Sequence, residues 1–222
     1  MADSFTGLDF AQALKISQPE KGYRFSMDAL MLASHVKVKG NEKLIDIGCG
    51  SGIISILLAH KYPGLNIIGI EIQEELYKLA QKNIKANGLE GRIRIIHDDV
   101  KNIKISKTEE PADIIVSNPP FDKKGAGRIS PNPQKAIAKH EITLDLDSLL
   151  NCSNRLLKDK GKLFVIFPFN RHRELMQGLK RHLFEPEYSR HVNIKTNSEP
   201  LRIIVCALKR GIGDSVYQGA IL

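Results

Sequence analysis

Apolar and polar positions along the chain follow two periods, one typical of buried strands and one typical of amphipathic helices. From residue 43 onward, short apolar segments alternate with longer segments that repeat an apolar residue every three or four positions. The expected strands are Lys43–Ile47, Asn66–Ile72, Arg92–His97, Ala112–Ser117, Lys162–Phe167, Tyr188–Lys195 and Leu201–Leu208. The expected helices are Ile53–His60, Gln73–Asn87, Asp147–Leu157 and Arg171–Leu183.

This alternation predicts one compact α/β domain with a doubly wound, mostly parallel sheet. Only a short link, Asn197–Pro200, joins the last two strands, so we expect them to pair antiparallel. Residues 1–40 stand outside the alternation and carry an amphipathic stretch, Asp28–Val36. We expect residues 1–40 to form a cap on the domain of residues 41–222.

Composition narrows the class of protein. The 222 residues are 42% hydrophobic and 26% charged, as in ordinary soluble proteins, and no apolar run is long enough to span a bilayer. The first residues have no basic stretch followed by an apolar core, so we expect no secretory signal. Cys49, Cys152 and Cys206 are widely spaced and form no metal-ligand cluster. We therefore expect a cytoplasmic protein without a metal ion or a membrane partner.

The net charge of +8 is unevenly distributed. Residues 1–121 hold 15 basic and 15 acidic residues, whereas residues 122–222 hold 18 basic and 10 acidic residues. Such an excess serves solubility, and it also suits an anionic partner such as a nucleic acid.

A glycine-rich loop follows the first strand. It reads Asp46-Ile47-Gly48-Cys49-Gly50-Ser51-Gly52 and leads into a predicted helix. Glycines allow a tight turn and a close approach of a ligand to the backbone, and the helix presents free N–H groups to that ligand. The spacing is GxGxG, and Ile53 stands where the dinucleotide fingerprint has its third glycine.

Acidic residues follow the next two strands. Glu71 comes 19 residues after Gly52, where a doubly wound domain places the carboxylate that binds ribose hydroxyls. Asp98 and Asp99 follow the third strand, and either carboxylate could accept from an adenine amino group, with Asp99 preferred. The alternative for each of these acids is a structural cap or a solvated side chain.

Residues 43–100 resemble the class I S-adenosylmethionine-dependent methyltransferases, which share the acid, the GxGxG loop and the acid that ends the second strand. The resemblance implies a Rossmann-like methyltransferase sheet and S-adenosyl-L-methionine as cofactor. The cofactor-binding residues expected on this basis are Asp46, Gly48, Cys49, Gly50, Glu71, Asp99 and Asn118.

Ser117 is followed by Asn118-Pro119-Pro120-Phe121 at the end of the fourth strand. Two prolines stiffen this loop, and its place at the carboxyl edge of a parallel sheet puts it in the ligand crevice. The Asn118 Oδ1 atom and the Pro119 carbonyl can each accept a hydrogen from an amine and aim its lone pair at a methyl donor. Phe121 offers a face on which a base can stack, or it packs in the core. The tetrapeptide resembles amino-methyltransferases that act on adenine N6, guanine N2, cytosine N4 or a glutamine amide.

Flanking segments resemble one family, the bacterial tRNA1(Val) (adenine-37-N6)-methyltransferases. They are Gln18–Leu30, Lys123-Lys124-Gly125 with His140-Glu141, and Ala207-Leu208-Lys209, so that the resemblance covers residues 8–210. It implies that the substrate is an adenosine beside the anticodon, in a single-stranded loop of tRNA. His140 and Glu141 are taken as structural, because the chemistry needs no histidine.

Basic residues near the tetrapeptide fit an RNA backbone or a solvated surface. Lys123, Lys124 and Arg128 directly follow it. In the helix near residues 171–183, Arg173, Gln177, Lys180 and Arg181 share one face, and Leu175, Leu179 and Leu183 share the other. We expect the leucines to pack on the sheet and the basic face to lie outward.

Two other enzyme activities and one non-catalytic function remain open. A glutamine N5-methyltransferase of release factors or an rRNA guanine-N2 methyltransferase would share the loop and the tetrapeptide. A nucleotide-binding module without catalysis would not need the amine-orienting acceptors of Asn118 and Pro119. The exact nucleotide and the oligomeric state do not follow from these residues.

Overall fold

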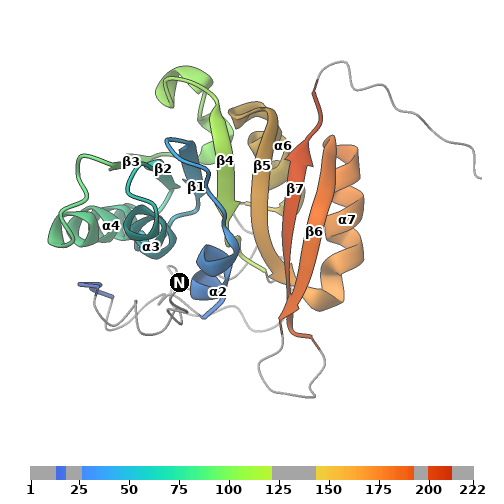
Figure 1. Ribbon diagram of the computed structural model, residues 1–222, viewed down its shortest axis with the longest axis horizontal. Coiled ribbons are helices and arrows are strands. Elements are labelled where there is room, and N and C mark those ends of the chain that lie inside the picture. The colour runs from blue at the N-terminus through green and yellow to red at the C-terminus, as the bar shows by residue number, and fades with distance from the viewer. Residues whose placement is uncertain (1–13, 19–26, 122–143, 193–199, 212–222) are drawn as a thin grey trace, which may run out of the picture.

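The computed structural model describes residues 14–18, 27–121, 144–192 and 200–211. Within these residues, strands form one sheet in the order β3-β2-β1-β4-β5-β7-β6. The strands are β1 (Lys43–Ile47), β2 (Asn66–Glu71), β3 (Ile93–His97), β4 (Ala112–Ser117), β5 (Leu157–Pro168), β6 (Phe184–Val192) and β7 (Arg202–Lys209). The five neighbouring strands β3, β2, β1, β4 and β5 pair in parallel, and β7 pairs antiparallel with both β5 and β6. The predicted doubly wound sheet with an antiparallel last strand is confirmed (Figure 1).

Helices cover both faces of the sheet. They are α2 (Met27–His35), α3 (Ile53–Lys61), α4 (Glu74–Ala86), α6 (Leu146–Leu156) and α7 (His172–Arg181), with short 3₁₀ turns η1 (Val100–Asn102), η2 (Ile105–Lys107) and η3 (Phe169–Arg171). Successive strand residues face opposite layers, so that Leu44 packs with α2 and α3 while Ile45 packs with α6 and α7. Leu44 and Ile45 are both fully buried, as expected for parallel strands covered on both faces.

The central boundaries agree with the sequence pattern, but those near the antiparallel strands do not. Strand β5 begins at Leu157, directly after α6, and not at Lys162. Helix α7 ends at Arg181, and Leu183 takes a left-handed backbone with φ of 60°. Leu183 is 55% exposed, so the prediction that it packs on the sheet with the other leucines of α7 is wrong. Phe184, the first residue of β6, is buried in its place.

Residues 14–18 and α2 lie against the domain. The Asn83 side chain accepts from Ser17 N at 2.8 Å and donates to Ser17 O at 3.1 Å, and Asn87 does the same for Lys15. Helix α2 packs against α3 and β5, and Figure 1 shows it beside the lower part of the sheet. That residues 1–40 act as a cap remains a prediction, because residues 1–13 and 19–26 lie outside the described part.

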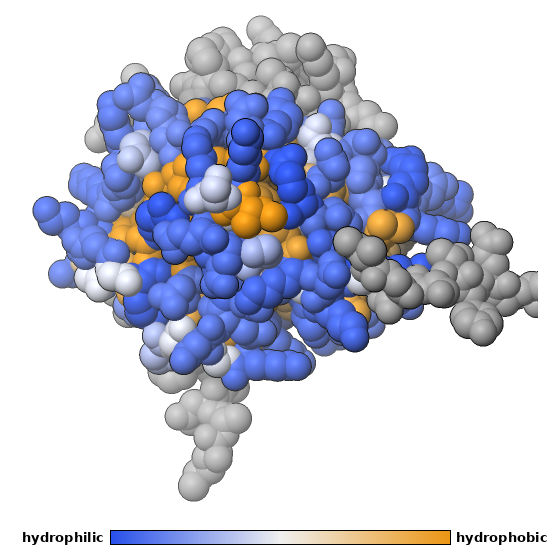
Figure 2. Space-filling model, turned by 90° about the horizontal axis from the view of Figure 1, so that it is seen from above, coloured by the Kyte–Doolittle hydropathy of each residue, from blue (hydrophilic) through white to orange (hydrophobic). Residues whose placement is uncertain are grey.

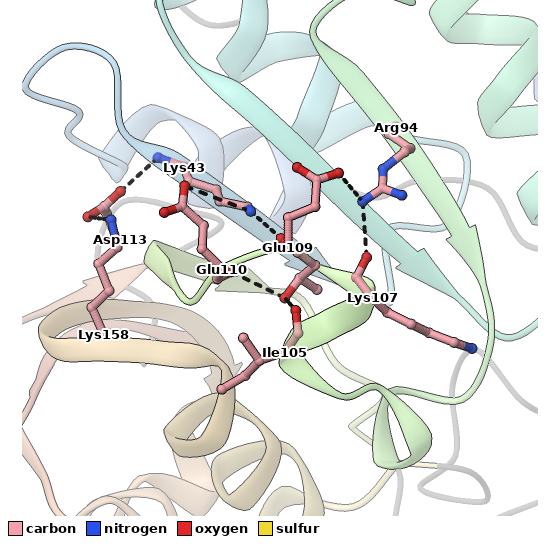
Figure 3. Close-up of polar contacts among 9 residues, drawn as sticks. Lys43, Arg94, Ile105, Lys107, Glu109, Glu110, Asp113 and Lys158 are labelled. Atoms are coloured by element: carbon pink, nitrogen blue, oxygen red, sulfur yellow. Dashed lines mark hydrogen bonds and ion pairs between the residues drawn. The ribbon is translucent and has the colours of Figure 1, made fainter.

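A polar network fixes the edge of the sheet at which the parallel strands begin (Figure 3). The Asp113 carboxylate accepts from Lys43 N at 2.9 Å and from Lys158 Nζ at 2.8 Å. The Arg94 guanidinium pairs with Glu109 at 3.2 Å. These contacts tie β4 to β1 and β5 and the connection between β3 and β4 to β3, and they leave the opposite edge for the site.

Figure 2 views this amino edge, and hydrophilic side chains cover most of the surface seen, with smaller hydrophobic areas between them. Among the helices of the described residues, none has the length and apolar character needed to cross a membrane.

Candidate active site

The glycine loop, residues 46–52, joins β1 to α3 at the carboxyl edge of the sheet. The backbone N–H groups of Gly48 and Cys49 both donate to Ile70 O, at 2.9 and 3.1 Å, which fastens the loop to the end of β2. Gly48 has φ of +70°, and a Cβ atom there would meet no atom within 4 Å. Its backbone is therefore left-handed and open to a ligand, as the sequence predicted.

Gly69 in β2 is a further glycine that the loop requires, and the sequence analysis did not identify it. A Cβ atom at Gly69 would lie 2.8 Å from Cys49 Sγ and 2.5 Å from Ile95 Cδ1. The Cys49 side chain thus packs directly on the backbone of β2, which sets the height of the loop above the sheet. Cys49 is 5% exposed and takes part in this packing.

Asp46 ends up fully buried beneath the loop. Its Oδ2 atom accepts from Ser55 Oγ at 2.7 Å, whereas its Oδ1 atom has no hydrogen-bond partner among the described residues. Burial disfavours the charged carboxylate and raises the pKa of Asp46 to about 7, although the Ser55 hydrogen bond acts in the opposite direction. A buried carboxylate oxygen without a partner is a position that a polar or cationic ligand can satisfy.

The raised pKa makes the stability of the ligand-free protein depend on pH. The folded protein keeps the Asp46 proton up to about pH 7, whereas the unfolded chain releases it near the usual value of 3.8. Stability therefore falls as pH rises between these values. We expect Asp46→Asn to remove this fall, so that the variant gains about 2 kcal/mol relative to the wild type between pH 5 and pH 8. Urea unfolding of both proteins at the two pH values measures it, and a pH-independent difference would contradict it.

Glu71 connects the end of β2 to the loop. Its Oε2 atom accepts from Gly50 N and its Oε1 atom from Gln73 N, both at 2.8 Å. The side chain is 5% exposed, and burial raises the pKa of Glu71 although backbone donors oppose the rise. Each carboxylate oxygen can still accept a second hydrogen bond, so Glu71 can both hold the loop and bind hydroxyls.

Asp98 and Asp99 follow β3 and line the same pocket. The Asp98 carboxylate accepts from Asp99 N at 2.8 Å and pairs with Lys107. Asp99 accepts from Lys101 N at 2.9 Å and caps η1, which is the structural role considered for it from the sequence. That Asp99 rather than Asp98 contacts the cofactor remains a prediction.

The tetrapeptide forms the wall of the pocket opposite the acidic residues. The pocket is lined at the carboxyl edge by Ile47, Gly48, Gly50, Ile70, Glu71, Ile72, Gln73, Leu76, Asp98, Asp99, Val100, Asn118, Pro119, Pro120 and Leu144. Ser117 Oγ donates to Ile47 O at 2.9 Å and so joins the ends of β4 and β1. The structure brings Gly48, Gly50, Glu71, Asp99 and Asn118 to one pocket. Asp46 and Cys49, which were also expected to bind the cofactor, are buried and do not line this pocket.

Phe121 follows the pocket wall and is held from three sides. Its ring meets the Phe167 ring edge-to-face at a centroid distance of 6.1 Å. The Arg202 Cζ atom lies 4.7 Å from the Phe121 ring centroid, and Arg171 Nη1 donates to Phe121 O at 2.6 Å. Both proposed roles, core packing and base stacking, remain open for this ring. Arg171 and Arg202 are distant from Phe121 in sequence, so the tetrapeptide alone could not predict their contacts with it.

The predicted RNA-binding residues are only partly described. Arg173, Lys180 and Arg181 are exposed on α7, whereas Leu175 and Leu179 are fully buried. Arg181 also pairs with Asp147 at 3.0 Å. Lys123, Lys124 and Arg128 lie outside the described residues, as do His140 and Glu141.

The chemistry of the pocket fits S-adenosylmethionine. This cofactor carries a sulfonium cation, an amino group and ribose hydroxyls. Glu71 offers a buried carboxylate at the pocket wall, whereas Asp46 lies fully buried beneath the loop and does not line the pocket. The glycine loop would hold the cofactor against the tetrapeptide, where it supplies an electrophilic methyl group.

Comparisons with known proteins agree with this reading of the pocket. Residues 24–191 match the family described as methyltransferase small domain. A tRNA1(Val) (adenine(37)-N6)-methyltransferase from Dyadobacter fermentans is 31% identical over 69% of this chain, which spans 62% of that relative. A protein of the same name from Dickeya chrysanthemi is 30% identical over 85% of this chain and 73% of its own length.

The fold itself is also shared. The ribosomal protein L11 methylase of Lactobacillus delbrueckii subsp. bulgaricus has a TM-score of 0.61 at 17% identity, covering 87% of this chain and 83% of its own. Two solved structures of geranyl diphosphate methyltransferase also share the fold, with TM-scores of 0.58 and 0.59 at 13% and 12% identity, and they hold S-adenosylhomocysteine and S-adenosylmethionine, respectively. The chain therefore belongs to the methyltransferase small domain family.

Proposed function

We propose that this enzyme transfers a methyl group to the N6 amine of an adenine in tRNA, namely adenosine 37 of the anticodon loop. The observation that carries the proposal is Asn118-Pro119-Pro120-Phe121, whose first three residues line the pocket shared with the glycine loop and Glu71. The names of relatives near 30% identity support tRNA as the substrate. A cytoplasmic location follows from this substrate.

The reaction needs orientation of the amine more than a strong base. The lone pair of an aromatic amine is delocalised into the ring, so the nitrogen is a poor nucleophile. The Asn118 Oδ1 atom and the Pro119 carbonyl would each accept a hydrogen bond from one N–H group of the amine. These two hydrogen bonds would direct the lone pair to the methyl group. The nitrogen becomes positively charged as the methyl group arrives, and these two oxygens stabilise that charge. The N–C bond would form as the C–S bond of the sulfonium breaks, with S-adenosylhomocysteine as the leaving group. The nitrogen would then lose its acidic proton to water without a dedicated general base.

A target in a loop is favourable for this geometry. An unpaired base costs less to turn out of its stack than a base in a duplex. This proposal includes two sets of residue roles. The residues proposed to bind the cofactor are Asp46, Gly48, Cys49, Gly50, Glu71 and Asp99. The residues proposed to be catalytic are Asn118, Pro119, Pro120 and Phe121.

Basic residues after the tetrapeptide and on α7 are proposed to contact RNA phosphates. They are Lys123, Lys124, Arg128, Arg173, Lys180 and Arg181. Replacing Lys123, Lys124 and Arg128 together should weaken tRNA binding. It should also reduce the magnitude of the slope of log affinity against log salt by about two to three, because three phosphate contacts would no longer release counterions on binding.

The matched control removes three exposed lysines from α4, namely Lys78, Lys82 and Lys85. It changes the net charge equally but leaves the region after the tetrapeptide intact. A slope that falls equally in both triple variants would show that only the net charge matters. A slope that changes in neither would contradict the assignment of these phosphate contacts.

The function is tested by mass spectrometry of nucleosides from the tRNA of a strain that lacks the protein. We expect one N6-methyladenosine to disappear, and to return with the wild-type gene but not with Asn118→Ala. Nucleosides from the rRNA and peptides of the release factors of the same strain are measured in parallel. Loss of an N2-methylguanosine from the rRNA would favour the guanine activity instead, and loss of a methylated glutamine from a release factor would favour the protein substrate.

A further inference from the structure

Arg202 occupies a position beside the target site that the sequence analysis did not identify. It is the first residue of β7, and its Cζ atom lies 4.7 Å from the ring centroid of Phe121. Phe121 directly follows Pro120, which lines the pocket. A planar cation therefore covers the aromatic ring that would otherwise be offered to the target base.

The guanidinium of Arg202 is held in a fixed orientation. Its Nε atom pairs with Asp28 Oδ2 at 3.1 Å, and its Nη1 atom donates to Leu201 O at 3.2 Å. The ring of Phe121 supports it by a cation–π contact. The Arg202 side chain is still 21% exposed, so this anchored group retains solvent access.

The partners of Arg202 favour a base over a phosphate as its ligand. Asp28, whose side chain is 15% exposed, already balances the positive charge, and this weakens attraction to a further anion. The plane of a guanidinium supported by an aromatic ring remains suited to stacking, as Arg planes do against unstacked RNA bases. Asn118, which lines the pocket, stands three residues before Phe121 in the tetrapeptide.

We propose that Arg202 is a substrate-binding residue whose guanidinium plane stacks on the target base, with Phe121 supporting it from behind. Asp28 in the first turn of α2 is then a positioning residue that fixes this plane. The inference rests on the proposed function and names which side chain meets the base. It also gives α2 a role in the site, through Asp28.

A double-mutant cycle between protein and RNA tests the contact. The probes are two anticodon stem-loop RNAs, one intact and one with an abasic site at the target adenosine. Arg202→Ala in the full chain should weaken binding of the intact RNA at least tenfold, by the usual effect of losing a stacking partner, and should change binding of the abasic RNA about twofold or less. Arg94→Ala is the control, because it removes an arginine with one carboxylate partner from the opposite edge of the sheet.

Two gentler variants separate stacking from charge and from a folding defect. Arg202→Lys keeps the charge but not the plane, so we expect it to lose most of the discrimination between the two RNAs. Asp28→Asn should reduce that discrimination and raise the KM for tRNA more than it lowers kcat. Equal losses for both RNAs in Arg202→Ala would overturn the proposal in favour of a phosphate contact. Full discrimination in Arg202→Lys would overturn it because the guanidinium plane would then not be needed.

The outcome is separable from that of the proposed function. A wild-type protein that methylates no tRNA adenine would refute the proposed function. A wild-type protein that methylates tRNA and prefers the intact RNA, with a preference unchanged in Arg202→Ala, would refute only the role of Arg202.

Discussion

Replacing Asn118 by alanine is expected to lower single-turnover methylation of tRNA by roughly 10²–10³-fold, as for removal of one preorganised hydrogen-bonding group. Asn118 stands at the pocket wall, and its Oδ1 atom would bind the amine most strongly as the nitrogen becomes tetrahedral. The lost interaction belongs mainly to the transition state, so turnover should fall much more than cofactor binding weakens. Rapid-quench kinetics with saturating cofactor measures the first quantity, and calorimetry measures the second.

Ser117→Ala is a useful companion to Asn118→Ala. Ser117 Oγ donates to Ile47 O at 2.9 Å and helps to place the loop, but the proposed chemistry gives its hydroxyl no part. We expect a much smaller loss of turnover from Ser117→Ala. Near-normal turnover in a folded Asn118→Ala variant would show that the amine is oriented by another group.

Replacing Glu71 by alanine is expected to weaken S-adenosylmethionine binding at least tenfold, since losing a charged acceptor costs roughly 1.5–3 kcal/mol. Two effects contribute. The carboxylate that would bind the ribose hydroxyls is lost, and Gly50 N and Gln73 N lose the acceptor that now lies 2.8 Å from each. Isothermal titration calorimetry on the folded variant measures the change.

Glu71→Gln and Glu74→Ala serve as controls for Glu71→Ala. Glutamine keeps the length of the side chain and one acceptor, so we expect an intermediate affinity. Glu74 is exposed and pairs with Lys78, and its removal changes the net charge equally without touching the loop. Cofactor affinity unchanged in Glu71→Ala would remove Glu71 from the binding site.

The sequence pattern predicted the centre of the fold well because buried parallel strands are short and uniformly apolar. Strands β1 and β4 begin and end at the predicted residues. The pattern failed at β5, where the polar residues Lys158 to Lys160 continue the strand before its apolar part. Leu157 pairs with Ala112 of β4 and the next pair is Lys162 with Ile114, so residues 158–161 form an irregularity of the strand that hydropathy does not indicate.

The candidate site was predictable where one short segment holds the relevant groups. Gly48, Glu71 and Asn118 lie at strand ends, and parallel strands bring their carboxyl ends to one edge. Asp28 and Arg202 were not predictable, because their contact joins residues 174 positions apart and follows only from α2 packing beside β7. Gly69 was missed for a similar reason, since the close approach of Cys49 is visible only in three dimensions.

The central claim is tested most directly by incubating the purified protein with S-adenosylmethionine and unmodified tRNA, and then identifying the methylated nucleoside and its position by mass spectrometry. The account predicts one N6-methyladenosine per tRNA, at position 37, formed by the wild type and lost in Asn118→Ala. Methyl groups on guanine, or no transfer to tRNA together with methylation of a release-factor glutamine, would contradict it.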